Sequence, residues 1–208
     1  MKTEKQRRVA PDTFGHAFGK VRAVACALAL AALSLQASAA SAGSPAPTLP
    51  PELEAVRDRL AKYKDPVAAV RDGYLSTLGC VHYPSGAMGV HFLNPALISP
   101  ELDPGKPQIL VYEPVGDRLE LVAAEWLVPL ATGITQRPSL FGRPFDGPMA
   151  GHEPLMPHEL HHYDLHVWLF RENPEGVFAA TNPSVSCEGY GYALLEGPPA
   201  TVAHHGAQ

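Results

Sequence analysis

The feature that most constrains the fold is an alternating stretch late in the chain, His162-Tyr163-Asp164-Leu165-His166-Val167-Trp168-Leu169-Phe170. It predicts a β-strand, because successive side chains of a strand point to opposite faces. One face would carry Leu165, Val167 and Leu169. The other would carry His162, Asp164, His166, Trp168 and Phe170. The sequence therefore predicts two imidazoles and a carboxylate in one row, about 7 Å apart per two-residue step, which suits a metal ion or a catalytic pair.

Residues 1–42 have the pattern of a signal peptide. Basic residues come first, an apolar run follows from Ala23 to Leu35, and the small-residue cleavage sites Ala37-Ser38-Ala39 and Ala40-Ser41-Ala42 end the segment. The apolar run is too short to remain as a membrane-spanning helix. We therefore expect a periplasmic or secreted protein with no stable membrane insertion after cleavage.

The charge of the remaining 166 residues excludes one class of partner. They carry ten Lys and Arg against nineteen Asp and Glu, a net charge of −9. No basic stripe is left to hold a phosphate backbone, so nucleic acid is not an expected partner. The length suffices for one domain with a sizeable core, and a small molecule is left as a possible partner.

Two cysteines, Cys80 and Cys187, lie outside the predicted signal peptide. In an oxidising compartment they predict one disulfide, which on the chain-entropy model would stabilise the fold by roughly 4–5 kcal/mol. The alternative is a pair of thiolate metal ligands, although neither cysteine belongs to a C-x-x-C pair.

Two helices are predicted after a flexible leader over residues 43–51. The first spans residues 52–64 with an apolar stripe at helical spacing. Asp65 and Pro66 suit the cap and the first position of the second helix. We expect the buried side of that helix to consist of Val67, Val70 and Tyr74.

The rest of the chain has the pattern of strands and loops. Strands are predicted at residues 90–94, 108–113, 118–128, 162–170 and 177–180, the second and third forming a hairpin. The Pro- and Gly-rich connection 129–161 predicts an ordered lid, and residues 197–208 a disordered tail. The expected architecture is one α+β domain over residues 52–196, with two N-terminal helices packed on a curved antiparallel sheet or a partly open β-barrel.

A metal site is the main chemical hypothesis. His91 lies mid-strand, and Glu125 lies on the otherwise apolar face of its strand. The predicted ligands are His91, His162 and His166. Glu125 would be a further ligand or a general base. Asp164 and Glu113 would accept hydrogen bonds from the ligating histidines and so orient them. Imidazoles with a carboxylate suit a divalent transition metal, above all Zn or Cu, and three protein ligands with an open position are typical of catalysis.

Two other interpretations of these residues remain. The segment His158-Glu159-Leu160-His161-His162 matches the H-E-x-x-H zinc motif, but that motif requires a helix and Pro157 stands immediately upstream. We therefore regard the match as accidental. Alternatively the histidines and acids are ordinary polar residues, in which case Glu113 would pair with Arg118 across the hairpin.

Several distinctive stretches lie along the predicted domain: Gly86-Ala87-Met88-Gly89-Val90-His91-Phe92-Leu93-Asn94-Pro95, Leu110-Val111-Tyr112-Glu113-Pro114, Glu125-Trp126, Phe145-Asp146-Gly147-Pro148-Met149, His162 to Leu169, Asn182-Pro183 and Val185-Ser186-Cys187. In these motifs the chain resembles a family of small, exported, uncharacterised bacterial proteins. The resemblance covers most of residues 52–187 and implies one continuous domain. It implies no activity and assigns no functional residue.

The preferred function is an exported metal-dependent protein, for which an enzyme acting on a small molecule is one role; the sequence leaves open whether it is an enzyme. The alternative is a metal-free module that binds a small ligand in an aromatic cleft closed by the 129–161 connection. The cleft would be lined by Trp126, Trp168, Phe145 and Tyr112. A structural role in the cell envelope is a third alternative.

Overall fold

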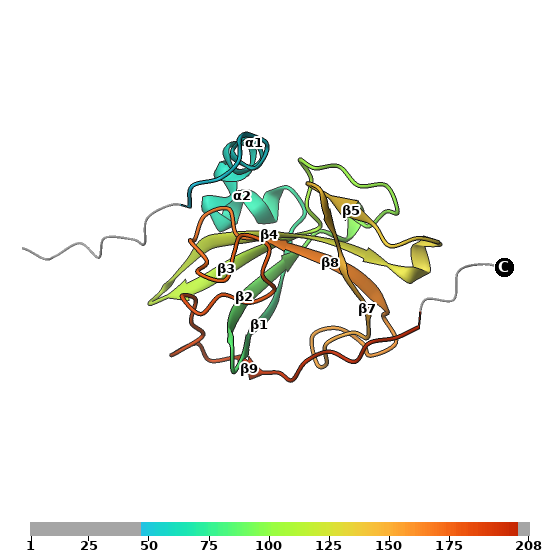
Figure 1. Ribbon diagram of the computed structural model, residues 1–208. Coiled ribbons are helices and arrows are strands. Elements are labelled where there is room, and N and C mark those ends of the chain that lie inside the picture. The colour runs from blue at the N-terminus through green and yellow to red at the C-terminus, as the bar shows by residue number, and fades with distance from the viewer. Residues whose placement is uncertain (1–46, 204–208) are drawn as a thin grey trace, which may run out of the picture. The chain divides into compact units, whose positions relative to one another are not determined.

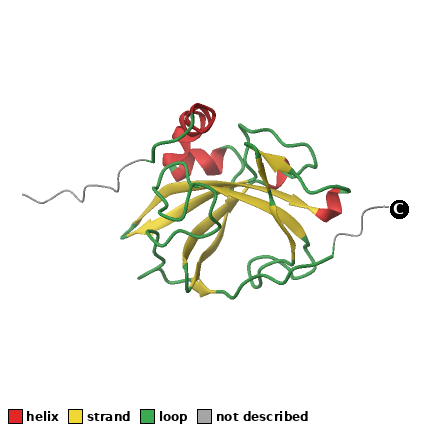
Figure 2. Ribbon diagram, in the orientation of Figure 1, coloured by secondary structure: helices red, strands yellow, loops and turns green. Residues whose placement is uncertain are grey.

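The computed structural model describes residues 47–203, and a curved seven-stranded sheet forms its centre (Figures 1 and 2). The predicted signal peptide lies outside the described residues. Within residues 47–203, no helix is long and apolar enough to cross a membrane. The strands lie in the spatial order β7-β8-β4-β3-β2-β1-β9.

The strands of the sheet are β1 (Leu75–Tyr83), β2 (Gly86–Leu93), β3 (Ile109–Val115), β4 (Arg118–Pro129), β7 (Asp146–Met149), β8 (His162–Val167) and β9 (Ala193–Leu195). Neighbours pair antiparallel except β1 and β9, which are parallel. The predicted α+β class with a curved sheet is confirmed, but the sheet is mixed rather than antiparallel throughout. The short strands β5 (Ser139–Leu140) and β6 (Arg143–Pro144) form a separate hairpin.

The strand predicted at residues 177–180 is wrong, because this segment forms turns. The backbone N–H of Trp168 donates to the carbonyl of Val177 at 2.9 Å, and its indole N–H donates to the carbonyl of Ala179 at 2.6 Å. Both carbonyls are therefore used by the residue that follows β8 and do not form a strand ladder.

The helices lie at the start of the described chain. Helix α1 (Pro51–Leu60) continues into a 3₁₀ turn, Ala61–Lys64, and α2 spans Pro66–Arg71; further 3₁₀ turns are Pro95–Leu97 and Leu130–Thr132. Asp65 caps α2 by accepting a hydrogen bond from the N–H of Val67 at 2.9 Å. Leu49, in the expected flexible leader, is buried in the core.

The predicted buried side of α2 is wrong in two of its three residues. Val67 and Val70 are 54% and 50% exposed, whereas Ala69 and Tyr74 are buried. With only six residues before the chain turns, α2 presents one small side chain to the core and not a long apolar stripe. Tyr74 packs edge-on against Tyr63 of the preceding 3₁₀ turn, with ring centroids 5.2 Å apart.

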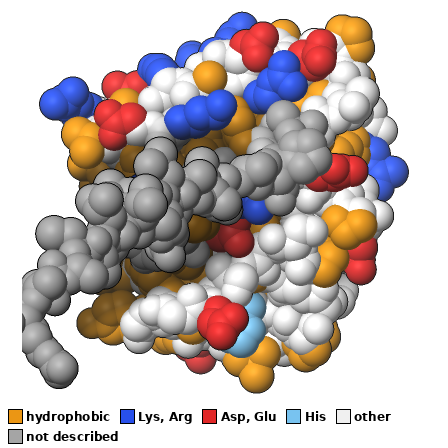
Figure 3. Space-filling view, turned by 90° about the vertical axis from the view of Figure 1, so that its left-hand side faces the viewer, with side chains coloured by type: hydrophobic (Ala, Val, Ile, Leu, Met, Phe, Trp, Pro, Cys, Tyr) orange, Lys and Arg blue, Asp and Glu red, His pale blue; other side chains and the backbone are white. Residues whose placement is uncertain are grey.

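The two faces of the sheet have different coverings. The helical segments lie over the convex face, and the concave face is covered by residues 150–161 and the C-terminal segment that contains β9 (Figure 1). On the convex side the Tyr112 hydroxyl donates to the carbonyl of Tyr63 at 2.7 Å. Figure 3 shows Lys and Arg side chains mixed with Asp and Glu along the upper edge of the molecule, where α1 and α2 lie.

Irregular pairing bends the sheet. Register shifts interrupt the β1–β2 pairing between Ser76 and Cys80 and the β3–β4 pairing between Val111 and Tyr112. Such bulges increase local twist and curvature. In β2, Gly89 has φ +113°, and a Cβ atom there would lie 2.5 Å from the carbonyl oxygen of Tyr112. Only glycine fits this position.

The C-terminal segment is attached at two places. The predicted disulfide Cys80–Cys187 is confirmed, with a Cα–Cα distance of 5.7 Å, and Cys80 pairs in register with Ala193 of β9. Residues 197–203, expected to be disordered, pair with the end of β7: the N–H of Val202 donates to the carbonyl of Pro148 at 3.0 Å. The remainder of the expected tail, residues 204–208, lies outside the described residues.

Candidate metal centre

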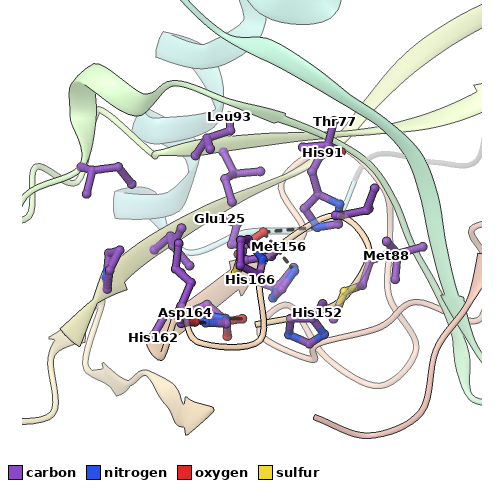
Figure 4. Close-up of a pocket in the computed structure, with 18 of the residues that line it drawn as sticks. Thr77, Met88, His91, Leu93, Glu125, His152, Met156, His162, Asp164 and His166 are labelled. Atoms are coloured by element: carbon purple, nitrogen blue, oxygen red, sulfur yellow. Dashed lines mark hydrogen bonds and ion pairs between the residues drawn. The ribbon is translucent and has the colours of Figure 1, made fainter. Parts of the chain in front are cut away.

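A cavity of about 350 Å³ lies against the concave face of the sheet. Its walls are mostly apolar and include Val81, Met88, Leu93, Ile109, Leu127 and, from residues 150–161, Leu155, Met156 and Leu160. Its ionisable side chains are His91, Glu125, His152, His162, Asp164, His166 and Glu196. None of the described residues that line it is Lys or Arg. The histidines and acids form two groups (Figure 4).

The first group, which we call the strand cluster, consists of His91 on β2, Glu125 on β4 and His166 on β8. Glu125 and His166 are directly opposite each other in the β4–β8 register. His91 lies on β2, which is separated from β4 by β3, so the two backbones are roughly 9–10 Å apart. The side chains of His91 and Glu125 meet across this distance because the sheet is concave on this side. The Glu125 Oε2 atom lies 3.3 Å from the Nε2 atoms of both His91 and His166.

These close contacts leave polar atoms unsatisfied. Within the described part of the chain, Oε2 of Glu125 and both ring nitrogens of His166 are buried without a hydrogen-bond partner. A buried polar atom left in this way costs roughly 1–3 kcal/mol. Two ligands bound tetrahedrally at 2.0–2.1 Å lie about 3.3 Å apart, which is the separation found here. The strand cluster therefore has the spacing of metal ligands and poor hydrogen-bond geometry.

The electrostatics of the strand cluster favour an ionised carboxylate. Burial raises the pKa of Glu125, but His166 and His91 outweigh burial and lower this pKa to about 2. Burial lowers the pKa of His91, but Glu125 outweighs it and raises that pKa above its ordinary value. The ionised carboxylate therefore calls for a positive charge beside it, which a protonated His91 or a bound cation would supply.

The second group, which we call the loop cluster, consists of His152 from residues 150–161 with His162 and Asp164 from β8. The ring centroids of His152 and His162 are 5.6 Å apart, and Nε2 of His162 lies 3.7 Å from Oδ2 of Asp164. Candidate ligand atoms of the three residues all lie within 4.8 Å of one another. Burial lowers the pKa of His162, but Asp164 outweighs it and raises that pKa.

Hydrogen bonds from behind orient both histidines of the loop cluster. The Nδ1 atom of His152 lies 2.9 Å from Oε2 of Glu196, which also accepts from the hydroxyl of Tyr83 at 2.9 Å. Burial raises the pKa of Glu196, but His152 and Tyr83 outweigh it and lower this pKa, so the carboxylate is an acceptor. The Nδ1 atom of His162 lies 3.1 Å from the carbonyl oxygen of Leu160.

The structure distributes the predicted ligands between the two clusters. His91 and His166 lie together with Glu125, but His162 and Asp164 belong to the loop cluster. The expectation of one site containing all three histidines is therefore not met. His162 and His166 are four residues apart on one strand, about 13 Å, which is too far for both to bind one ion directly.

Glu113 is not in the cavity, so its predicted supporting role is wrong. Its carboxylate accepts hydrogen bonds from Arg171 and from the backbone N–H of Ser186, the latter at 3.0 Å. The alternative pairing with Arg118 is also absent from the ion pairs of the described residues, because Arg118 pairs with Glu120 at 3.4 Å.

The predicted aromatic cleft is also wrong. Its four side chains are fully buried and none lines the cavity: Trp126, Trp168, Phe145 and Tyr112. They pack in the core, and the indole N–H of Trp126 donates to the carbonyl of Asp103 at 3.0 Å. The cavity is apolar through aliphatic and methionine side chains.

Only the end of the predicted lid covers the cavity. Residues 152–160 contribute cavity-lining side chains, whereas β5 and β6 lie elsewhere, with Phe141 between them against Trp126.

Residues 158–161 are turn and coil, so the H-E-x-x-H match has no helix to support it. His152, Tyr83 and Glu196 were not predicted, because they meet only after the chain has folded.

Comparison with protein-family models, curated proteins and solved structures gave no match for this chain. The fold and cavity define an α+β domain with a curled mixed sheet whose His, Glu and Asp groups can bind metal.

Proposed function

We propose that this protein is an exported metal-dependent enzyme that acts on a small, largely apolar molecule. In this proposal the strand cluster binds one divalent transition-metal ion, and the cavity binds the substrate beside it. Two imidazoles and a carboxylate suit Zn or Cu.

The position of Glu125 Oε2 carries the proposal. This atom lies 3.3 Å from both imidazole nitrogens, yet it makes no hydrogen bond within the described chain. An ion at the centre of the strand cluster would satisfy the carboxylate and both histidines together. Because Glu125 lies between the two histidines, we assign it as a ligand in preference to a general base.

The surroundings favour catalysis over a structural role. Three protein ligands leave a coordination position open, and the apolar cavity lies next to it. A metal ion there would polarise a carbonyl group or lower the pKa of bound water. Since no Lys or Arg is among the described lining residues, the metal would be the main positive charge available to an anionic group of the substrate.

The disulfide supports export, because such bonds persist in the periplasm or outside the cell. We therefore propose a periplasmic or secreted location and a small molecule as the partner. The proposal includes neither nucleic acid nor stable membrane insertion.

A metal-free module for small apolar molecules is the second candidate. One observation favours it: the carboxylate of Glu125 raises the pKa of His91, so an imidazolium could neutralise the acid without a metal. The apolar walls of the cavity would then supply the binding energy. Ligand binding that survives EDTA would support this candidate.

The deciding experiment is elemental analysis of untagged protein purified without chelator. We expect about one equivalent of Zn or Cu, or more, and its loss from the strand cluster in His166→Ala. The matched control is His82→Ala, a histidine of β1 that does not line the cavity. Less than about a tenth of an equivalent, with no thermal shift on adding Zn or Cu, contradicts the proposal.

A further inference from the structure

We infer that the loop cluster, His152 with His162 and Asp164, is a second divalent-cation site in the same cavity. The inference rests on the proposed function only through the shared cavity, because the two clusters have no residue in common. Figure 4 shows His152, His162 and Asp164 grouped below Glu125, His91 and His166.

The spacing of the loop cluster is that of ligands and not of a hydrogen-bonded pair. The 3.7 Å between His162 Nε2 and Asp164 Oδ2 exceeds hydrogen-bond length. It is close to the separation of two atoms that bind one ion from different sides. Both side chains are almost completely buried, with 1% and 7% of their surface exposed.

The tautomers of both histidines are set for binding a cation. Glu196 and the Leu160 carbonyl can only accept, so Nδ1 of His152 and Nδ1 of His162 must each donate a proton to them. In the neutral imidazole each ring then has its lone pair on Nε2, and a cation would take the place of any proton there. A ligating histidine almost always donates its other ring N–H to a carboxylate or carbonyl, which orients the ring and raises its basicity. Both histidines of the loop cluster show this arrangement.

The carboxylates of the cavity also favour a cation at the loop cluster. Three carboxylates line it, those of Glu125, Asp164 and Glu196, and no described lining residue is Lys or Arg. One divalent ion at the strand cluster would leave an excess negative charge in an apolar enclosure, which is costly. A second divalent ion at the loop cluster would place positive charge beside Asp164 and Glu196 and change the total from −1 to +1.

Zinc stoichiometry tests the inference on the full protein. The protein is loaded with Zn²⁺, equilibrated against a competing chelator of known affinity, and analysed for metal and for thermal unfolding. We expect about two equivalents in the wild type and about one in His152→Ala, with the strand cluster still loaded. Asp164→Asn gives the same result if His152→Ala does not fold. The matched control His158→Ala removes an exposed histidine of the same loop and should retain about two equivalents.

The variants distinguish each failure. About one equivalent in the wild type that is lost only in His166→Ala overturns the second site and leaves the proposed function standing. About one equivalent that is lost in both His166→Ala and His152→Ala indicates a single shared ion and overturns the inference as well. No zinc in the wild type overturns both. Loss of an equivalent in His158→Ala shows surface binding and overturns the assignment to the loop cluster.

Discussion

The two clusters of the cavity use the same residue types but are held in different ways. The strand cluster comes from three strands of the sheet, and the β4–β8 register alone places Glu125 opposite His166. The loop cluster depends on His152, which is oriented by Glu196 from the C-terminal segment, 44 residues further along the chain. The sheet therefore fixes all of the first cluster, whereas the second combines two residues of β8 with His152, which a long-range contact fixes.

The two clusters also differ in their hydrogen bonds. His166 has both ring nitrogens unsatisfied among the described residues, whereas each histidine of the loop cluster has an acceptor at Nδ1. The strand cluster thus has ligand atoms at metal spacing but little support behind them. In the loop cluster each histidine has a hydrogen-bond acceptor behind it, so its affinity should respond to changes that never touch the cation.

The largest effect should follow removal of the disulfide in Cys80→Ser/Cys187→Ser. The bridged cysteines are 107 residues apart, and the chain-entropy model gives a loss of about 4–5 kcal/mol in the free energy of unfolding. Because Cys80 pairs beside β9, the segment that carries Glu196 also loses its anchor. Urea denaturation measures the stability, and chelator competition should show zinc weakened more at the loop cluster. Equal weakening at both clusters would contradict the comparison.

Glu125→Gln should act on the strand cluster alone. The amide is a poor ligand and carries no charge. Loss of a group that only hydrogen-bonds a ligand lowers metal affinity by about 10–100-fold, so loss of the ligand itself should lower zinc affinity there by more than about 100-fold. The loop cluster should keep its ion. Competition titrations resolve the two sites, and Glu120→Gln, on the same strand but outside the cavity, is the control. Simultaneous loss of both ions would show that the clusters are one site.

The sequence predicts the strand cluster better than the loop cluster for a physical reason. Alternation in β8 and the unexpected acid on β4 are local patterns, so His166 and Glu125 could be recognised on cavity-facing positions. The disulfide followed from the compartment and the cysteine count. His152 lies in a Pro- and Gly-rich loop without periodicity, and Glu196 follows a short strand at the end of the domain, so neither had a local signal.

The same limit explains the errors in the fold. The predicted row is confirmed for His162, Asp164 and His166, which all line the cavity, but β8 ends at Val167, so Trp168 and Phe170 do not continue it. Strand geometry separates His162 from His166 by about 13 Å, so a shared face does not mean a shared ion. The aromatic side chains were assigned to a cleft because they are large and apolar, yet these properties equally suit the core, where they lie. Which face of the sheet becomes the cavity depends on curvature, and curvature comes from bulges that alternation does not reveal.

Glu196→Gln tests whether the hydrogen bond behind His152 matters. The amide keeps the shape but loses the charge that draws a proton to Nδ1, so zinc affinity at the loop cluster should fall by roughly 10–100-fold. The strand cluster should change little. Glu188→Gln is a control on the same C-terminal segment, exposed and outside the cavity. An unchanged loop cluster would mean that Glu196 only attaches the segment.

Gly79→Ala should produce the smallest effect and probes the loop without touching a ligand. A Cβ atom at residue 79 would lie 2.7 Å from Leu194 Cδ1 and 2.8 Å from Leu155 Cδ2. These are ends of flexible side chains, so we expect both to shift and the loop that carries His152 to loosen. Zinc affinity should fall by a few-fold, about 1 kcal/mol, at the loop cluster and remain constant at the strand cluster. Competition titrations and proteolysis within residues 150–161 measure the change. If proteolysis increases while both zinc affinities stay the same, the loop cluster does not depend on the position of this loop. The two clusters would then differ in their hydrogen bonds alone.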